Sequence, residues 1–226
     1  YYSRMSRPAH IPIFNLFGET TAFPDVVHCE AVLDRAGLHG WMISPHRHTQ
    51  MAQVFQISSG VAQVTLDGVE RRLKPGQYLY IPPQIVHGFA FSRGTEGTVL
   101  SIPSPVVARL GPKTPALSAW LGASQHGALS EDAGALLTSV VQAYAGNGNF
   151  RAQRLVSLTH ALLAALADES TAETPSPKDP NRQMQQLDAL ITGHLAEGWS
   201  ARDYASALHV TTGHLNRVVR GAAGMS

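Results

Sequence analysis

The sequence predicts an α+β protein in which a region of short strands precedes a helical region. From residue 41 to about residue 105, short apolar segments are separated by glycine and proline turns, which is typical of an all-β sandwich or barrel. After Pro105 the apolar residues recur every three or four positions, as on one face of a helix. The chain has 226 residues, 44% of them apolar, so it is long enough for two compact domains and is not a disordered or fibrous chain.

The strand region consists of apolar segments bounded by turn residues. Asp67-Gly68 favours a tight hairpin turn, and Pro75-Gly76, Pro82-Pro83 and Gly94 mark further turns. We expect strands at residues 54–57, 61–66, 72–73, 78–81 and 89–91.

Two helices are expected after the strands. The first carries Leu136, Val140, Val141 and Tyr144 on one face, and the second, within residues 149–168, carries the leucine stripe Leu155, Leu158, Leu162 and Leu166. Charged residues make up only 15% of the chain, below the roughly 25% of typical soluble domains, which indicates surface covered by a partner subunit. We therefore interpret residues 111–168 as the dimerisation segment of a homodimer, with the leucine stripe as the subunit contact.

The remaining sequence predicts a linker and a second, helical domain. Residues 169–182 contain three prolines and no large aliphatic residue, which is typical of a linker. In residues 183–226, one helix ends near Gly198, Ser200 with Asp203 can cap a second, and a third runs from Gly213 to Arg220. Two short helices joined by a three- to four-residue turn are the arrangement of a helix-turn-helix, although an ordinary helical cap has the same pattern.

Overall composition excludes several classes of protein. Seventeen Lys and Arg residues against sixteen Asp and Glu give a formal net charge of +1, so no strong overall field favours nucleic acid or anionic lipid. The single cysteine, Cys29, excludes an intramolecular disulfide and a multi-cysteine zinc site, and it is compatible with a reducing cytosol. No apolar run approaches the ~20 residues of a membrane helix, and no signal segment opens the chain, so we expect a cytoplasmic protein.

Three histidines stand at regular spacing in the strand region. The first pattern is G-x5-H-x-H-x4-Q-x6-G, and the second is G-x5-P-x4-H; together they comprise Gly40, His46, His48, Gln53, Gly60, Gly76, Pro82 and His87. Two histidines two residues apart on a strand point to the same face, so both imidazoles can enter one cavity. Residues 40–91 resemble the two motifs of the cupin superfamily, in which Glu usually stands at Gln53, Gly at Gln84 and Asn at Phe91. The resemblance implies a double-stranded β-helix, a small jelly roll, with these residues facing its interior.

The motif residues are candidate metal ligands. Three neutral imidazoles of His46, His48 and His87 and the amide oxygen of Gln53 suit a divalent metal such as Zn, Fe, Ni or Mn. Gln53 in place of Glu removes a negative charge, so the site would have a higher positive charge and would favour an anionic ligand. Alternatively, the same residues line a ligand pocket by hydrogen bonding alone, without a metal.

Aromatic residues near the motifs indicate what the interior would bind. Trp41, Phe55 and Tyr80 lie close in sequence to the histidines, and rings, phenol hydroxyls and imidazoles together suit a small aromatic acid. We therefore take these three residues, with His46, His48, Gln53 and His87, as the candidate ligand-binding set. The alternative is that the inward-facing rings are ordinary core.

A second resemblance covers nearly the whole chain. Residues 199–226 resemble the opening of the DNA-binding domain of the AraC/XylS family of bacterial regulators, with matching small and apolar positions at Ala205, Leu208, Val210, Leu215, Val218, Gly221 and Gly224. Segments 11–19, 45–48, 53–55, 81–83, 86–88 and 94–95 are similar to one branch of that family, which regulates breakdown of 4-hydroxybenzoate, 4-hydroxyphenylacetate and related aromatic acids. The resemblance implies a homodimer that activates a catabolic promoter.

The expected recognition helix carries polar side chains suited to DNA. The candidates are Thr212, His214, Asn216, Arg217 and Arg220. Asn and Arg can pair with adenine and guanine edges in the major groove, whereas Thr212 and Arg220 suit phosphates. The family's domain has two helix-turn-helix units, and this sequence stops at Ser226, after the first recognition helix, so we expect an incomplete DNA-binding domain that binds weakly.

These observations combine into one interpretation with two alternatives. We interpret the chain as an aromatic-acid-responsive transcriptional regulator, not an enzyme, with an arm and cupin sensor in residues 1–110, followed by the dimerisation segment, the linker and the partial DNA-binding domain. The first alternative is a metal-dependent cupin enzyme, a dioxygenase or an isomerase. The second is a sugar sensor with the same architecture.

Overall fold

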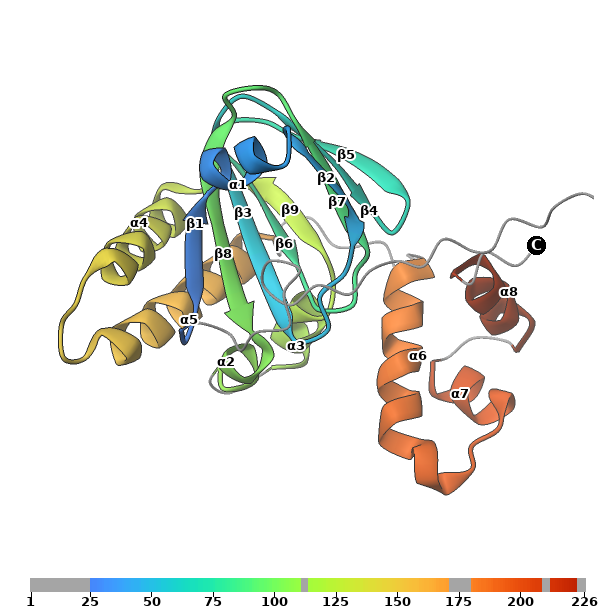
Figure 1. The fold of residues 1–226 in the computed structure, drawn as a ribbon. Coiled ribbons are helices and arrows are strands. Elements are labelled where there is room, and N and C mark those ends of the chain that lie inside the picture. Colours follow the sequence, from blue (N-terminus) through green and yellow to red (C-terminus); the bar gives the residue numbers. More distant parts are fainter. Residues whose placement is uncertain (1–24, 111–113, 171–179, 209–211, 223–226) are drawn as a thin grey trace, which may run out of the picture. The chain divides into compact units, whose positions relative to one another are not determined.

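The computed structural model describes residues 25–110, 114–170, 180–208 and 212–222, which form two compact units divided between Thr171 and Ala172. The N-terminal arm and its segment 11–19 lie outside the described residues. The α+β prediction is confirmed, because an antiparallel jelly roll is followed by helices (Figure 1). None of the described helices is long and apolar enough to cross a membrane.

The jelly roll of the first unit consists of two antiparallel sheets. The five-stranded sheet has the order β1-β8-β3-β6-β9, and the four-stranded sheet has the order β2-β7-β4-β5. The strands are β1 (His28–Ala31), β2 (Met42–His46), β3 (Met51–Ser59), β4 (Ala62–Leu66), β5 (Val69–Leu73), β6 (Gln77–Ile81), β7 (His87–Phe91), β8 (Glu96–Pro103) and β9 (Gln125–Ala128). At the β4–β5 hairpin, Asp67 and Gly68 both have positive φ, 45° and 83°, as a two-residue turn between twisted strands requires.

The core of this unit has an inner and an outer layer, because the five-stranded sheet is covered on both faces. On β3, Phe55 and Ile57 belong to the inner cluster between the sheets, whereas Ala52 and Val54 belong to the outer cluster under the helices. Odd-numbered residues of β3 therefore point into the jelly roll. The helices of this unit are α1 (Val32–Leu38), α2 (Ser104–Ala108), α3 (Pro115–Leu121), α4 (Glu131–Ala145) and α5 (Arg151–Ser170).

The leucine stripe lies inside the first unit, which corrects its expected role as a subunit contact. Leu155, Leu162 and Leu166 are each 0% exposed, and the half-buried Leu158 packs against the same outer cluster. Figure 1 shows α5 beside α4, next to the five-stranded sheet. The stripe is buried against this chain's own α4 and sheet because an apolar helix face packs on whatever apolar surface is nearest. The homodimer stays a prediction.

The second unit is a small helical domain built from α6 (Pro180–His194), a short 3₁₀ turn (Leu195–Glu197), α7 (Ala201–Ala207) and α8 (Thr212–Ala222). Its core is formed by Leu187, Ala205 and Leu215, one residue from each helix. The turn ends at Gly198, which has φ +66°, and the Asp203 carboxylate accepts hydrogen bonds from the Ser200 N–H and hydroxyl at 2.8 and 2.7 Å. This cap begins α7 where the sequence predicts it.

The expected linker, residues 169–182, contains helix at both ends. Helix α5 continues to Ser170 and α6 begins at Pro180, while residues 171–179 lie outside the described part of the chain. Proline is well suited to the first turn of α6, because the N–H that it lacks has no partner there.

Candidate metal and ligand site

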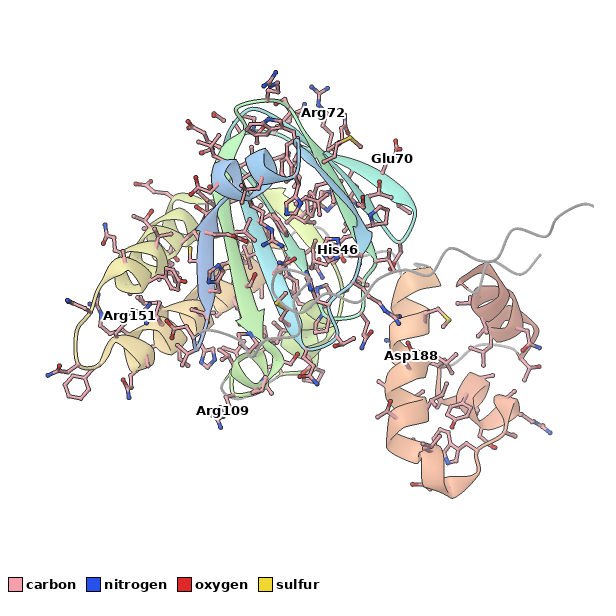
Figure 2. All side chains as sticks on the ribbon, viewed as in Figure 1. His46, Glu70, Arg72, Arg109, Arg151 and Asp188 are labelled. Atoms are coloured by element: carbon pink, nitrogen blue, oxygen red, sulfur yellow. The ribbon has the colours of Figure 1, made fainter. Side chains whose placement is uncertain are left out.

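The structure brings the three motif histidines together inside the jelly roll. His46 ends β2, His48 follows in the loop before β3, and His87 begins β7; all three side chains are buried. Their ring centroids are 5.0 Å apart for His46 and His48, 4.4 Å for His46 and His87, and 5.2 Å for His48 and His87. One ring nitrogen of each lies within 4.8 Å of the others, which is close enough for one ion to contact all three. Figure 2 labels His46, within the jelly roll.

Backbone carbonyls orient two of these imidazoles. His46 Nδ1 lies 2.8 Å from the carbonyl oxygen of Ser44, and His87 Nδ1 lies 2.9 Å from that of Ile85. A carbonyl oxygen only accepts, so in each ring Nδ1 carries the proton and Nε2 presents its lone pair. His87 Nε2 is buried and has no hydrogen-bond partner among the described residues.

The electrostatic surroundings favour neutral imidazoles. Burial, helped by the charges of the neighbouring histidines, lowers the pKa of His87 to about 3. Burial also lowers the pKa of His46, and the positive charges of Arg35 and His39 act in the same direction. Neutral imidazole is the form that binds a metal, so the cluster is ready for an ion at neutral pH.

Gln53 lies at the same end of the jelly roll as the histidines. Strand β4 pairs with β7 so that Ala62 lies opposite Phe91 and Leu66 lies opposite His87. Since β3 leads directly into Ala62, the C-terminal end of β3 lies near Phe91. The N-terminal end of β3 lies at the same end of the jelly roll as His87. Gln53 is at this N-terminal end, on the inner face of β3, and is 6% exposed. Its Nε2 donates to the Ser101 hydroxyl at 3.1 Å, and its Oε1 is buried without a hydrogen-bond partner among the described residues.

Comparison with known proteins identifies this part of the chain. Residues 38–103 match the cupin domain family. The chain therefore contains a cupin domain, whose boundaries enclose all three histidines and Gln53. No curated protein matches the chain.

KdgF, CuxR and ToxT are among the solved structures similar to the chain. KdgF from Halomonas sp. is 30% identical, over 27% of this chain and 57% of its own, with a TM-score of 0.26. The AraC-like transcriptional activator CuxR is 15% identical, over 75% of this chain and 60% of its own, with a TM-score of 0.43. ToxT from Vibrio cholerae with a bound unsaturated fatty acid is 10% identical, over 88% of this chain and 74% of its own, with a TM-score of 0.45. The chain thus spans little more than half of KdgF and of CuxR.

The donor atoms of the cupin domain fit a divalent metal ion. Two of them, His87 Nε2 and Gln53 Oε1, are buried acceptors without hydrogen-bond partners in the described structure, and burying such atoms is unfavourable unless something satisfies them. An ion would satisfy both. Three imidazoles and one amide oxygen form a borderline-soft set that suits Zn, Fe, Ni or Mn better than Mg or Ca.

Of the aromatic candidates, Phe55 lies next to the histidine layer and Trp41 does not. The Phe55 ring lies 4.4 Å from that of Phe89, which contacts His87 edge-on at 6.0 Å. Trp41 accepts a backbone hydrogen bond from Phe91, at the opposite end of β7 from His87, and is half-buried against the inner cluster. Trp41 is therefore separated from the histidines by Phe89 and Phe91.

Tyr80 belongs to the outer face of the sheet, which corrects its assignment to the ligand-binding set. Leu79 and Ile81 on β6 point into the jelly roll, so Tyr80 between them points out. Its ring stacks on Trp120 at 4.8 Å, and its hydroxyl donates to the carbonyl of Leu121 at 2.9 Å. The phenol group fastens α3 to the sheet and does not reach the histidines.

In the second unit, the structure describes only part of the predicted DNA-contacting set, and its contact with DNA stays a prediction. Thr212 and Asn216 on α8 are exposed, whereas Leu215 and Val218 are buried, so α8 has one covered face and one open face. All five candidates lie on α8, but the side chains of His214, Arg217 and Arg220 lie outside the described residues.

Sequence reasoning missed Ser101, the hydrogen-bond partner of Gln53. It is 0% exposed on β8 and pairs directly with Gln53 across the sheet. The only signal in the sequence is a hydroxyl in the otherwise apolar stretch 99–102. The carbonyls of Ser44 and Ile85 were also missed, because backbone atoms carry no sequence signature.

Proposed function

We propose that the chain is a ligand-responsive transcriptional regulator that acts in the cytoplasm. In this proposal the cupin domain senses a small aromatic acid, and the second unit binds DNA and activates an aromatic-acid catabolic operon as part of a homodimer. The observation that carries it is that one chain combines a buried cluster of three histidines, with the buried Gln53 at the same end of the jelly roll, and a helical unit in which α6, α7 and α8 pack around Ala205. Neither feature requires the chain to be an enzyme.

The cupin site would hold a divalent metal ion through His46, His48, Gln53 and His87. When bound, such an ion supplies a Lewis-acidic centre that attracts anions. These four ligands are all neutral, so none of the ion's charge is cancelled by a carboxylate of the protein. Arg35 lowers the pKa of His46 through its positive charge, which is partly balanced by the Glu30 carboxylate 3.7 Å from its guanidinium. This balance supports an anionic ligand over a neutral sugar.

The rings beside the site support an aromatic ligand. Phe55 and Phe89 lie next to the histidine layer, and Phe89 stacks on Phe91 with centroids 5.3 Å apart. The three phenylalanines are at most 7% exposed, so they fill the interior beyond the histidines. A ligand would therefore bind at the end of the jelly roll where the histidines lie. A small carboxylic acid with one aromatic ring matches both, because its carboxylate suits the metal site and its ring suits the phenylalanines.

Ligand class is tested by thermal shift of the Zn²⁺-loaded 226-residue protein. The matched pair is 4-hydroxybenzoate and 4-hydroxybenzyl alcohol, with galacturonate as an anionic sugar. At 100 times its dissociation constant, a ligand stabilises the folded state by ~2.7 kcal/mol. We expect a shift with the benzoate only, lost in His87→Ala and kept in His126→Ala, because His126 is exposed on β9.

The outcomes separate the alternatives. A shift with galacturonate but not with the benzoate would favour the sugar sensor. Turnover of hydroxybenzoate by the iron-loaded protein would decide for the metal-dependent enzyme, whereas saturable binding without turnover supports the sensor. The absence of any shift with aromatic acids would refute the proposed ligand class.

DNA binding is tested by selection from a random-sequence duplex pool at low salt, followed by fluorescence anisotropy of the enriched duplex. We expect Asn216→Ala, on the open face of α8, to weaken binding to the enriched duplex roughly 5- to 150-fold, from the 1–3 kcal/mol of a bidentate base contact. Gln186→Ala, exposed on α6, is the matched control and should bind like the parent. If no sequence is enriched, the DNA-binding proposal fails.

A further inference from the structure

Gln53 and Ser101 form a buried hydrogen-bonded pair on neighbouring strands of the cupin domain. They face each other in the register of β3 and β8, and their exposed fractions are 6% and 0%. The Gln53 amide nitrogen donates to the Ser101 hydroxyl at 3.1 Å. The other end of the amide, Oε1, is buried and has no hydrogen-bond partner in the described part of the chain.

A carboxamide on the inner face of β3, at the same end of the jelly roll as the histidines, has two orientations: one end of the amide binds Ser101 and the other end is left for the interior. With nitrogen inward, its N–H groups would donate to an imidazole lone pair such as that of His87 Nε2. With oxygen inward, two acceptors face each other, which is unfavourable unless a cation lies between them. The structure has the amide nitrogen on Ser101, so the carbonyl oxygen is the end left for the histidine side.

The hydroxyl of Ser101 is suited to hold this orientation. It accepts from the amide nitrogen as observed, and it can instead donate to the carbonyl oxygen if the amide turns over. An aliphatic residue in its place would leave a buried N–H group without a partner in the oxygen-inward orientation, which is costly. The alternative orientation would then be favoured, because its N–H groups find imidazole acceptors.

We propose that Ser101 is a positioning residue that keeps the Gln53 carbonyl oxygen turned toward His46, His48 and His87 and thereby sets the affinity of the site for a divalent metal. The inference deepens the proposed function and rests on the metal site described there. It also explains how a neutral amide can replace the carboxylate usual at this motif position: a carboxylate presents oxygen in either orientation, whereas an amide needs a partner that selects its oxygen.

The test is a double-mutant cycle on the full 226-residue chain, with Zn²⁺ alone as the probe and a chromophoric chelator as the competitor. We expect Ser101→Ala to weaken Zn²⁺ binding roughly 10- to 100-fold, the usual cost of removing a partner that orients a metal ligand. In a Gln53→Leu background the same substitution should change Zn²⁺ affinity little, since no amide remains to orient. Ser59→Ala, at the far end of β3, is the matched control and should bind Zn²⁺ like the parent.

Co²⁺ supplies a readout that a purely structural effect would not give. Ser101→Ala and Gln53→Leu should change the visible Co²⁺ spectrum in the same way, because both remove the same oxygen ligand, and Ser59→Ala should leave it unchanged. In Gln53→Glu, which presents oxygen in either orientation, Ser101→Ala should weaken Zn²⁺ binding less than in the parent.

The failures of the two proposals are distinguishable. If the parent protein binds neither Zn²⁺ nor Co²⁺, the proposed metal site fails and takes this inference with it. If the parent binds the metal and Ser101→Ala binds equally well, only the role of Ser101 is refuted. An equal loss in the parent and Gln53→Leu backgrounds would likewise refute it, because the loss would not pass through the amide.

Discussion

Replacing Leu162 with alanine tests whether the leucine stripe is core of a single chain or a contact between subunits. Leu162 is 0% exposed and lies in the outer cluster between α5 and the five-stranded sheet. The substitution removes three buried carbons, which costs about 2.4 kcal/mol at about 0.8 kcal/mol for each, and the cavity left behind raises the total to about 3–4 kcal/mol. For a domain of this size, we expect the melting temperature to fall by roughly 6–16 °C.

The assay combines calorimetry with light scattering on the same samples. Ala161→Ser, an exposed neighbour on α5, is the control and should melt within a degree or two of the parent. Leu158→Ala should cost about half as much as Leu162→Ala, because Leu158 is only half-buried. The reasoning is wrong if Leu162→Ala melts like the parent while its mass in solution falls to that of a monomer, since that result would place the residue between subunits.

Three further predictions concern other parts of the chain. Gly88→Ala should weaken Zn²⁺ binding measurably in the chelator competition, because a Cβ there would lie 3.1 Å from the carbonyl oxygen of Ile43 and push away the strand that carries His46; parent-like affinity would contradict this. Burial, with the nearby charge of Glu169, raises the pKa of Tyr78 to about 12, so its contribution to stability is present below pH 10 and is lost as the pH rises from 10 to 12. Tyr78→Phe should therefore lose about 2 kcal/mol less than the parent over that range in chemical unfolding, and equal losses would refute the assignment. Ala205→Leu should destabilise the second unit by roughly 1–3 kcal/mol in circular dichroism melts, because Ala205 is 2% exposed in its core, whereas the exposed Ala207→Leu should not.

Elements set by local chemistry were predictable from the sequence. The Asp67-Gly68 turn has positive φ at both residues, which few other dipeptides allow, so this dipeptide alone predicts the β4–β5 hairpin. Ser200 and Asp203 begin α7 through one carboxylate that accepts two hydrogen bonds. The spacing of His46 and His48 predicted that their imidazoles share one cluster, and the two rings do lie together, beside His87. His48 nevertheless follows the end of β2 in a loop, so the two histidines do not lie on one continuous strand.

The wrong predictions for Tyr80 and the leucine stripe have a common physical cause. An apolar pattern in the sequence shows that a face is buried but does not identify the surface that buries it. All of residues 78–81 on β6 are buried because the sheet is covered on both faces, so the strand shows no polar alternation from which the direction of Tyr80 could be read. The leucine stripe is equally ambiguous, since its spacing is the same whether a sheet or a partner covers it. Strand β9, with the sequence Gln-His-Gly-Ala, was missed because it has no β-branched or large apolar residue and pairs with β6 through its backbone.

The charge balance of the candidate metal site depends on the groups that hold its ligands in place. His46 and His87 donate Nδ1 to main-chain carbonyls two residues earlier, and Gln53 donates to a hydroxyl, so the partner in each of these three contacts is a neutral group. A carboxylate in any of these roles would place a negative charge next to the ion and reduce its attraction for an anion. In the proposed metal site the four ligands are neutral, so an anion that enters the site would balance the charge of a bound divalent ion. We therefore predict selectivity for a carboxylate, and the benzoate and benzyl alcohol pair measures that difference directly.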